Sequence, residues 1–278
     1  MTFRHTIARS VTATGTALHA GVAVNMRLLP APAGAGIVFR RTDLGVEIPA
    51  RYDLVGETRL GTVLEKDGAR VGVVEHLLAA CAGAQIDDLT VELDGPEPPI
   101  LDGDALSYLV LLQDRETLGM LRQALRLLRP VTVEQGDAKA SLLPAETPSF
   151  FYALDYAVIG RQEMDFAFSR DTFRDQIAPA RTFGFLKELE GLNKMKLALG
   201  ATLDNTLALD DGGVVNKDRQ RFADEFVRHK ILDAIGDMAL AGAPLIARFE
   251  GRKSGHGTNN ALLRALFADP ANYEMAEL

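Results

Sequence analysis

The chain has 278 residues, of which 47% are hydrophobic and 24% charged, and its formal net charge is −8 at pH 7. These proportions are typical of a globular protein with a sizeable core, and the length suggests about two domains of roughly 150 residues each. The negative charge argues against general nucleic-acid binding, which needs a basic surface.

The single cysteine, Cys81, excludes an internal disulfide framework and fits a reducing compartment. The N-terminal residues contain no apolar core of signal-peptide length. No run approaches the roughly 18 apolar residues of a membrane span. We therefore expect a cytoplasmic protein.

The first half of the chain predicts short strands separated by glycine and proline turns. We expect these strands at residues 5–12, 22–29, 36–40, 61–65 and 88–94. A short apolar helix carrying Glu75 and His76 lies between the last two. Three prolines make residues 94–99 a rigid loop, and a helix over 105–118, capped by Asp102 or Asp104, follows it.

The second half repeats this order of strands and then helices, beginning near Leu125. We expect strands at 128–134, 138–143, 152–157, 164–168 and 243–250, and helices at 171–178, 183–191, 219–241 and 258–267. The pattern predicts an α+β fold of two similar domains, residues 1–124 and 125–278. If their helix layers pack against each other, the helix of His76 meets the long helix 219–241.

The long helix carries three ionisable residues at successive four-residue steps, His229, Asp233 and Asp237. Residues four apart on a helix project from one face. Apolar neighbours such as Leu232 and Ile235 indicate that this face is partly buried. Three ionisable groups on such a face are costly unless they are paired or bind a metal.

His76 adds a second imidazole to His229 and Asp233. Two imidazoles and one carboxylate, with a fourth position left for water, are the usual composition of a catalytic zinc site, and Fe²⁺ suits the same ligands. Glu75 points about 100° away from His76 around the helix. It is therefore a candidate general base beside a metal-bound water.

Two loop residues are further candidates. His256 lies between two glycines before a helix and could protonate a leaving amine while Asp237 holds its imidazolium. The simpler interpretation is a histidine packed at a helix start. Thr182 could donate to an oxyanion, whereas its simpler interpretation is a helix N-cap.

The remaining candidates concern substrate binding. Lys230, beside His229, and Lys253, before a glycine-rich turn, could hold an anionic substrate, although most lysines are solvated surface charge. The amphipathic stretch after Thr182 is typical of a core, but an apolar tunnel for an acyl chain would use the same residues: Phe185, Leu186, Leu189, Leu192, Leu197, Leu199, Leu203 and Leu207.

Five segments resemble, in the same order, the UDP-3-O-acyl-N-acetylglucosamine deacetylases, the zinc enzymes of the committed step of lipid A synthesis in Gram-negative bacteria. The segments are Val-Glu-His at 74–76, Asp-Gly-Pro-Glu-Pro-Pro-Ile-Leu-Asp-Gly at 94–103, Ala-Arg-Thr-Phe-Gly-Phe at 180–185, His-Lys-Ile-Leu-Asp-Ala-Ile-Gly-Asp at 229–237 and Lys-Ser-Gly-His at 253–256. The resemblance covers about residues 4 to 268.

The resemblance implies two α+β domains with their helices sandwiched between two sheets, and an insert in the second domain that forms an apolar passage for a fatty acyl chain. It implies zinc ligation by His76, His229 and Asp233. It implies that Glu75 is the general base and that His256 is the general acid. It also implies that Asp237 orients His256 and that Thr182 donates to the oxyanion. It places Lys230 and Lys253 at the polar end of the substrate, and Phe183, Phe185, Leu189, Leu192 and Leu203 near the acyl chain.

The implied reaction is hydrolysis of the N-acetyl group of UDP-3-O-(3-hydroxyacyl)-N-acetylglucosamine. Separately, we expect the protein to be a monomer. Two departures stand out: Ala20 replaces a usual Ser or Thr, and Gly61 replaces a frequent Cys. A zinc amidase acting on another acylated sugar is the nearest alternative. A non-catalytic lipid-sugar binding module is the other, and the presence of Glu75 and His256 argues against it.

Overall fold

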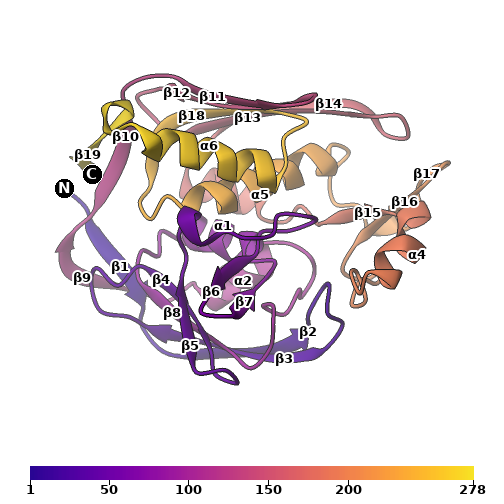
Figure 1. Cartoon of the computed structure of the whole chain (residues 1–278), viewed down its shortest axis with the longest axis horizontal. Helices are drawn as coiled ribbons and strands as arrows, with labels where there is room; N and C mark the ends of the chain where they lie inside the picture. The colour runs from indigo at the N-terminus through magenta and orange to yellow at the C-terminus, as the bar shows by residue number, and fades with distance from the viewer.

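The computed structural model describes all 278 residues and places a layer of helices between two β-sheets. Figure 1 shows α1, α5 and α6 in the middle, one sheet above them and the other below. The helices are α1 Glu75–Ala84, α2 Leu106–Leu111, α3 Arg170–Thr172 with a π-helical turn at Phe173–Ile177, α4 Leu186–Lys194, α5 Glu225–Ala239 and α6 His256–Ala268. The expected α+β class, with helices between two sheets, is confirmed.

The lower sheet has five strands in the order β2-β3-β8-β4-β5. These are β2 Val11–Thr16, β3 Ala23–Pro30, β8 Leu89–Leu93, β4 Ile37–Arg41 and β5 Val46–Pro49. Alternation along β3 shows why the sheet faces the helices: Val24, Met26 and Leu28 are buried while Asn25 and Arg27 between them are exposed. Successive side chains on a strand point to opposite faces, so one face packs on the helix layer.

The upper sheet has seven strands, with β18 paired to β12, β10 and β13. Its strands are β10 Gln123–Leu127, β11 Val131–Gln135, β12 Ala138–Pro144, β13 Ser149–Tyr156, β14 Gly160–Ala167, β18 Leu245–Arg252 and β19 Tyr273–Glu277. The smaller sheets pair β1 Phe3–Ile7 with β9 Arg115–Leu121, β6 Leu64–Lys66 with β7 Ala69–Val71, and β16 Leu207–Asp210 with both β15 Phe183–Phe185 and β17 Gly213–Val214.

The chain passes from the first group of sheets to the second between β9 and β10, at Arg122. The domain limits 1–124 and 125–278 stay a prediction. No helix is both long and apolar enough to cross a membrane.

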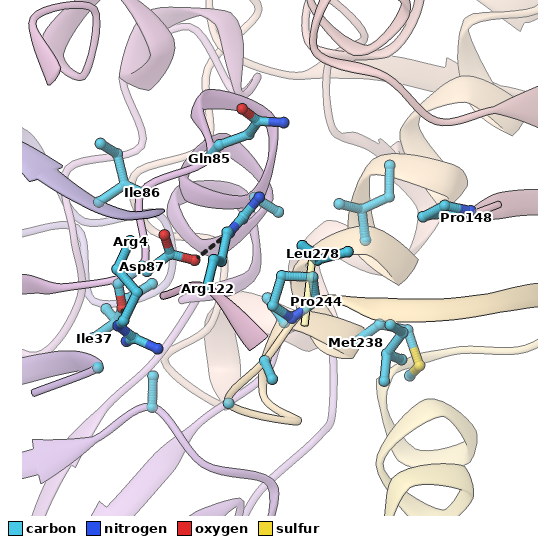
Figure 2. Close-up of a pocket in the computed structure, with 18 of the residues that line it drawn as sticks. Arg4, Ile37, Gln85, Ile86, Asp87, Arg122, Pro148, Met238, Pro244 and Leu278 are labelled. Atoms are coloured by element: carbon cyan, nitrogen blue, oxygen red, sulfur yellow. Dashed lines mark hydrogen bonds and ion pairs between the residues drawn. The ribbon is translucent and has the colours of Figure 1, made fainter. Parts of the chain in front are cut away.

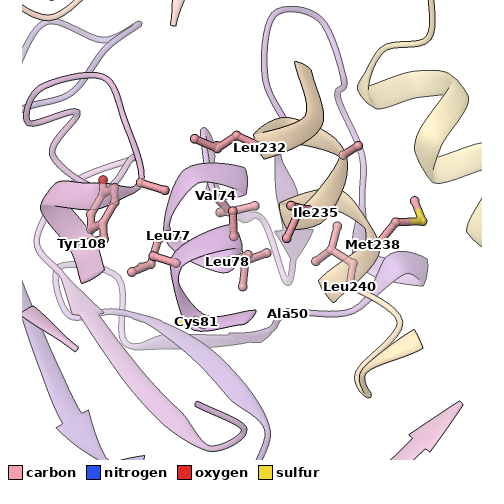
Figure 3. Close-up of a cluster of buried hydrophobic side chains, with 14 of the residues drawn as sticks. Ala50, Val74, Leu77, Leu78, Cys81, Tyr108, Leu232, Ile235, Met238 and Leu240 are labelled. Carbon is pink, nitrogen blue, oxygen red and sulfur yellow. The ribbon is translucent and has the colours of Figure 1, made fainter. Parts of the chain in front are cut away.

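The core is centred on the contact between α1 and α5, where apolar side chains of both helices face each other (Figure 3). Leu77 and Leu78 of α1 and Leu232 of α5 have no exposed surface. A helix buried on nearly every side, as α1 is, needs apolar residues all round. Its sequence, with Leu, Ala and Cys throughout, supplies them.

Gly236 allows the two helices to approach at backbone distance. A Cβ atom at this position would lie 2.0 Å from the carbonyl oxygen of Glu75. Only glycine tolerates such an approach without displacing the neighbouring backbone. The contact brings the start of α1, with His76, against the middle of α5.

Several predicted elements were wrong in extent. The expected strand 5–12 is two strands, β1 and β2, and the expected helix 105–118 ends at Leu111. Residues 115–121 instead form β9, which pairs with β1. Thr117 and Gly119 have low helix propensity, so pairing with β1 decides their conformation.

Two helix starts were also predicted too early. Residues 183–185 form β15, parallel to β16, and α4 begins only at Leu186. The helix expected from 219 begins at Glu225, whose carboxylate accepts hydrogen bonds from the amides of Arg221 and Phe222 and so fixes a turn before it. Six short strands, β5, β7, β10, β16, β17 and β19, were not predicted.

Candidate metal and catalytic site

Three potential ligands from two helices converge in the structure. His76 is the second residue of α1, whereas His229 and Asp233 lie one turn apart on α5. Their ligand atoms all lie within 4.8 Å of one another. Asp233 Oδ1 is 3.3 Å from His229 Nε2 and 3.7 Å from His76 Nε2, and all three side chains are buried.

The imidazoles of His76 and His229 are both in environments that favour the neutral form, which is the form that binds a metal. Burial lowers the pKa of His76 to about 3 and also lowers the pKa of His229. His229 Nδ1 lies 3.1 Å from the carbonyl oxygen of Ala180, so this nitrogen donates its proton there. The lone pair of His229 is therefore on Nε2, the atom that faces Asp233.

Asp233 is held as an ionised carboxylate. Burial alone would raise its pKa, but cationic neighbours, Lys230 among them, lower the pKa further than burial raises it. Lys230 Nζ donates to Asp233 Oδ2 at 2.8 Å, which leaves Oδ1 facing the two imidazoles. Two neutral nitrogens and one carboxylate oxygen, all deprotonated and buried, fit a divalent metal with an open coordination position.

Glu75 lies beside this set without belonging to it. Its Oε2 accepts the Thr62 amide at 3.0 Å, and its Oε1 is 3.6 Å from His256 Nε2. Burial raises the pKa of Glu75 to about 7. A carboxylate that takes up a proton near neutral pH has the property that a general base needs.

His256, the first residue of α6, is paired with Asp237 of α5 through Nδ1 and Oδ2 at 2.9 Å. Burial alone would lower the pKa of His256, but Asp237 and Glu75 together raise it to about 10. His256 is therefore protonated at neutral pH, as a general acid must be. Protonation also argues against the overlapping set of Glu75, Asp233 and His256 as metal ligands, although those atoms lie equally close.

Thr182 lies in the loop that also carries the Ala180 carbonyl. Its amide donates to the Gly103 carbonyl at 2.8 Å, and its side chain lines the same cavity as the cluster. Because α4 begins three residues after Phe183, Thr182 is not the N-cap of that helix. The simpler interpretation of Thr182 is therefore wrong.

A cavity of about 920 Å³ opens over the cluster. All residues to which the family resemblance assigns a role line it except Asp237, which is bonded to His256. From the wider amphipathic stretch, Leu197, Leu199 and Leu207 do not line it. One wall comes from the insert formed by β15, α4, β16 and β17, which projects from the body of the molecule (Figure 1). The apolar residues predicted near an acyl chain all belong to this wall: Phe183, Phe185, Leu189, Leu192 and Leu203.

The two lysines contribute differently to the cavity. Lys230 is held between Asp233 and the ring of Phe183, whose centroid is 5.5 Å from Nζ. Lys253 is exposed at the rim, 3.7 Å from Asp137, and its backbone has a positive φ of 49°.

A second cavity, of about 640 Å³, lies at the far ends of α1 and α5 (Figure 2). Two of its arginines are already paired: Arg122 Nε contacts Asp87 at 2.8 Å and Arg4 contacts Asp88 at 2.7 Å. Neither set of potential metal ligands lies here. The chemistry therefore belongs to the larger cavity.

Sequence reasoning missed two partners of Asp237. Thr62 Oγ1 donates to Asp237 Oδ1 at 2.6 Å, and Asn259 Nδ2 donates to Oδ2 at 2.9 Å. Asn259 follows His256 by three residues on one helix, so its position on the same face could have been found from spacing. Thr62 comes from a loop, and no spacing indicates it.

The comparisons with known proteins agree with this geometry. The family model described as LpxC, UDP-3-O-acyl N-acetylglycosamine deacetylase, matches residues 4–268. A Myxococcus xanthus (strain DK1622) protein named UDP-3-O-acyl-N-acetylglucosamine deacetylase is 45% identical over 279 residues, which cover 98% of this chain and 88% of that protein. A Marinobacter nauticus protein of the same name is 47% identical over 280 residues, which cover 98% of this chain and 92% of that protein.

Proposed function

Since the chain belongs to the UDP-3-O-acyl N-acetylglycosamine deacetylase family, we propose that it hydrolyses the N-acetyl group of UDP-3-O-(3-hydroxyacyl)-N-acetylglucosamine. The products are acetate and a free amine, in the committed step of lipid A synthesis. The observation that carries the proposal is the convergence of His76, His229 and Asp233 beside Glu75 and His256.

The proposed metal is Zn²⁺, held by His76 Nε2, His229 Nε2 and Asp233 Oδ1. Bound there, it would lower the pKa of a water ligand towards about 7 and polarise the amide carbonyl. Fe²⁺ suits the same donor atoms, so the metal content of freshly purified protein distinguishes the two.

Glu75 Oε1 is the proposed acceptor of the proton of the attacking water, because Oε2 is held by the Thr62 amide. The hydroxyl of Thr182 donates to the oxyanion that develops on the carbonyl oxygen. Amines leave poorly unless they are protonated, and the Nε2–H of His256 supplies that proton. Asp237 keeps the Nδ1–H of the same ring directed towards itself.

Lys230 and Lys253 are proposed to face the polar part of the substrate, and the insert wall to face its acyl chain. Roughly ten methylenes at about 0.8 kcal/mol each would contribute on the order of 8 kcal/mol before ordering costs. The chain should therefore dominate recognition of the substrate.

The test is acetate release from the acylated UDP sugar, compared with the same sugar lacking the acyl chain. We expect efficient turnover of the first and a kcat/KM lower by orders of magnitude for the second. Comparable efficiency for both would rule out the passage, and faster turnover of an acylated sugar without UDP would favour a different zinc amidase. A cytoplasmic location and a monomeric state stay predictions.

A further inference from the structure

Thr62 forms hydrogen bonds to two of the residues proposed to move protons or to hold those that do, Glu75 and Asp237. It lies in the loop before β6, and only 1% of its surface is exposed. Its amide donates to Glu75 Oε2 at 3.0 Å and its hydroxyl donates to Asp237 Oδ1 at 2.6 Å. Its carbonyl accepts the amide of Val74, the residue that precedes α1, at 3.4 Å.

The amide contact fixes which oxygen of Glu75 is available. A carboxylate whose Oε2 is held by a backbone N–H cannot rotate freely about its terminal bond. Oε1 is then left towards the cavity, 3.6 Å from His256 Nε2. This is the oxygen that must take a proton in the proposed reaction.

The hydroxyl contact fixes the other half of the pair. The Thr62 hydroxyl is the donor, and the carboxylate oxygen of Asp237 accepts. Asp237 Oδ2 accepts from both His256 Nδ1 and Asn259 Nδ2 at 2.9 Å. The three donors hold the carboxylate in one orientation, and this orientation turns His256 Nε2 towards Glu75.

We propose that Thr62 is a positioning residue that sets the distance and orientation between Glu75 and the Asp237–His256 pair. Glu75 is on α1 and Asp237 is on α5, so a single residue bound to both carboxylates couples the two helices at the reacting centre. The inference rests on the proposed deacetylase function.

The decisive variant is Thr62→Val, which keeps the amide and the side-chain shape but removes the hydroxyl. We expect kcat to fall roughly 10- to 100-fold with KM within about twofold, as for loss of one hydrogen bond to a charged group. Thr62→Ser restores the hydroxyl and should recover activity to within about threefold. Metal content should equal that of wild type in both variants.

A double-mutant cycle with Asp237→Asn tests the coupling. In that background Thr62→Val should cost less than about threefold, because the hydroxyl no longer has an ionised partner. Equal losses in both backgrounds, equal losses for Val and Ser, or a fully active Thr62→Val would each overturn the inference. An inactive wild type would instead refute the deacetylase function.

A spectroscopic measurement without substrate provides the second readout. In metal-free protein, the Nδ1–H resonance of His256 should be sharp and strongly downfield in wild type and Thr62→Ser, since it is held in a buried hydrogen bond to Asp237. In Thr62→Val it should broaden or shift as Asp237 gains freedom. An unchanged resonance in Thr62→Val would contradict the proposal even if that variant were unstable.

Discussion

The candidate metal and catalytic cluster differs from the insert in how far its side chains are buried and held in place. In the cluster, His76, Asp233 and Glu75 are all less than 5% exposed, and each carboxylate has a hydrogen-bond donor. In the insert, Leu186 and Leu203 are 41% and 51% exposed. The first region is organised before substrate arrives, whereas the second presents apolar surface that an acyl chain would cover. Changes in the cluster should therefore alter kcat, whereas changes in the insert should alter the affinity for the acylated substrate.

Removing the metal should have the largest effect on activity, and it should act through the cluster rather than through the insert. We expect dialysis against a chelator to reduce deacetylation to the background of the assay, because the proposed water activation depends on the ion. Added Zn²⁺ should restore it. Elemental analysis before and after dialysis checks the loading, and full activity at zero metal content would contradict the assignment.

Glu75→Gln should lower kcat by about 10²- to 10⁴-fold, since it removes the base but preserves the shape of the side chain. Substrate affinity and metal content should change little, because the insert and the three ligands are intact. Affinity can be measured by calorimetry at a temperature where turnover is slow. Wild-type turnover would refute the base assignment, and Glu116→Gln, at an exposed position outside the cavity, is the control.

Gly236→Ala should destabilise the protein by about 1–3 kcal/mol, because the new methyl would overlap the Glu75 backbone. Metal affinity should fall as well, since α1 must move away from α5. The matched control is Gly191→Ala in α4, where the added Cβ meets nothing within 4 Å. Relief of glycine's helix penalty should stabilise that variant by up to about 1 kcal/mol. Chemical denaturation measures the free energy of unfolding of both variants. It thereby compares the close-packed contact between α1 and α5 with the open surface of α4.

Leu189→Ser should have the smallest effect and should be confined to the acyl chain. Losing part of one leucine contact costs about 1–1.5 kcal/mol, or roughly tenfold in kcat/KM for the acylated substrate. Turnover of a substrate without the chain should not change. Met195→Ser, on the same insert but outside the cavity wall, is the control. An equal loss of kcat/KM with both substrates would show that Leu189 supports the fold and does not contact the acyl chain.

The sequence predicted which residues converge better than it predicted the elements around them. His229, Asp233 and Asp237 share one helix, so their common face follows from helical spacing alone. The partnership with His76 needed two segments about 150 residues apart to meet, which spacing cannot show. It rested on donor chemistry and on the resemblance to the family.

The misses have a common physical cause. Residues 115–121 became a strand because β1 was available to pair with them, and residues 183–185 did so because β16 was available. Such choices depend on tertiary partners rather than on local pattern. Thr62 was missed for the same reason, because its role comes from lying between Glu75 and Asp237 in space.

The division of the ligands between α1 and α5 has a consequence for assembly. A chain in which these two helices have not yet docked can offer an ion one imidazole from one side, or one imidazole and one carboxylate from the other. Tight metal binding therefore requires that α1 and α5 are correctly packed against each other. A bound ion would therefore stabilise the folded state as well as take part in the reaction. In metal-free chains, the contact between α1 and α5 would be the first to open.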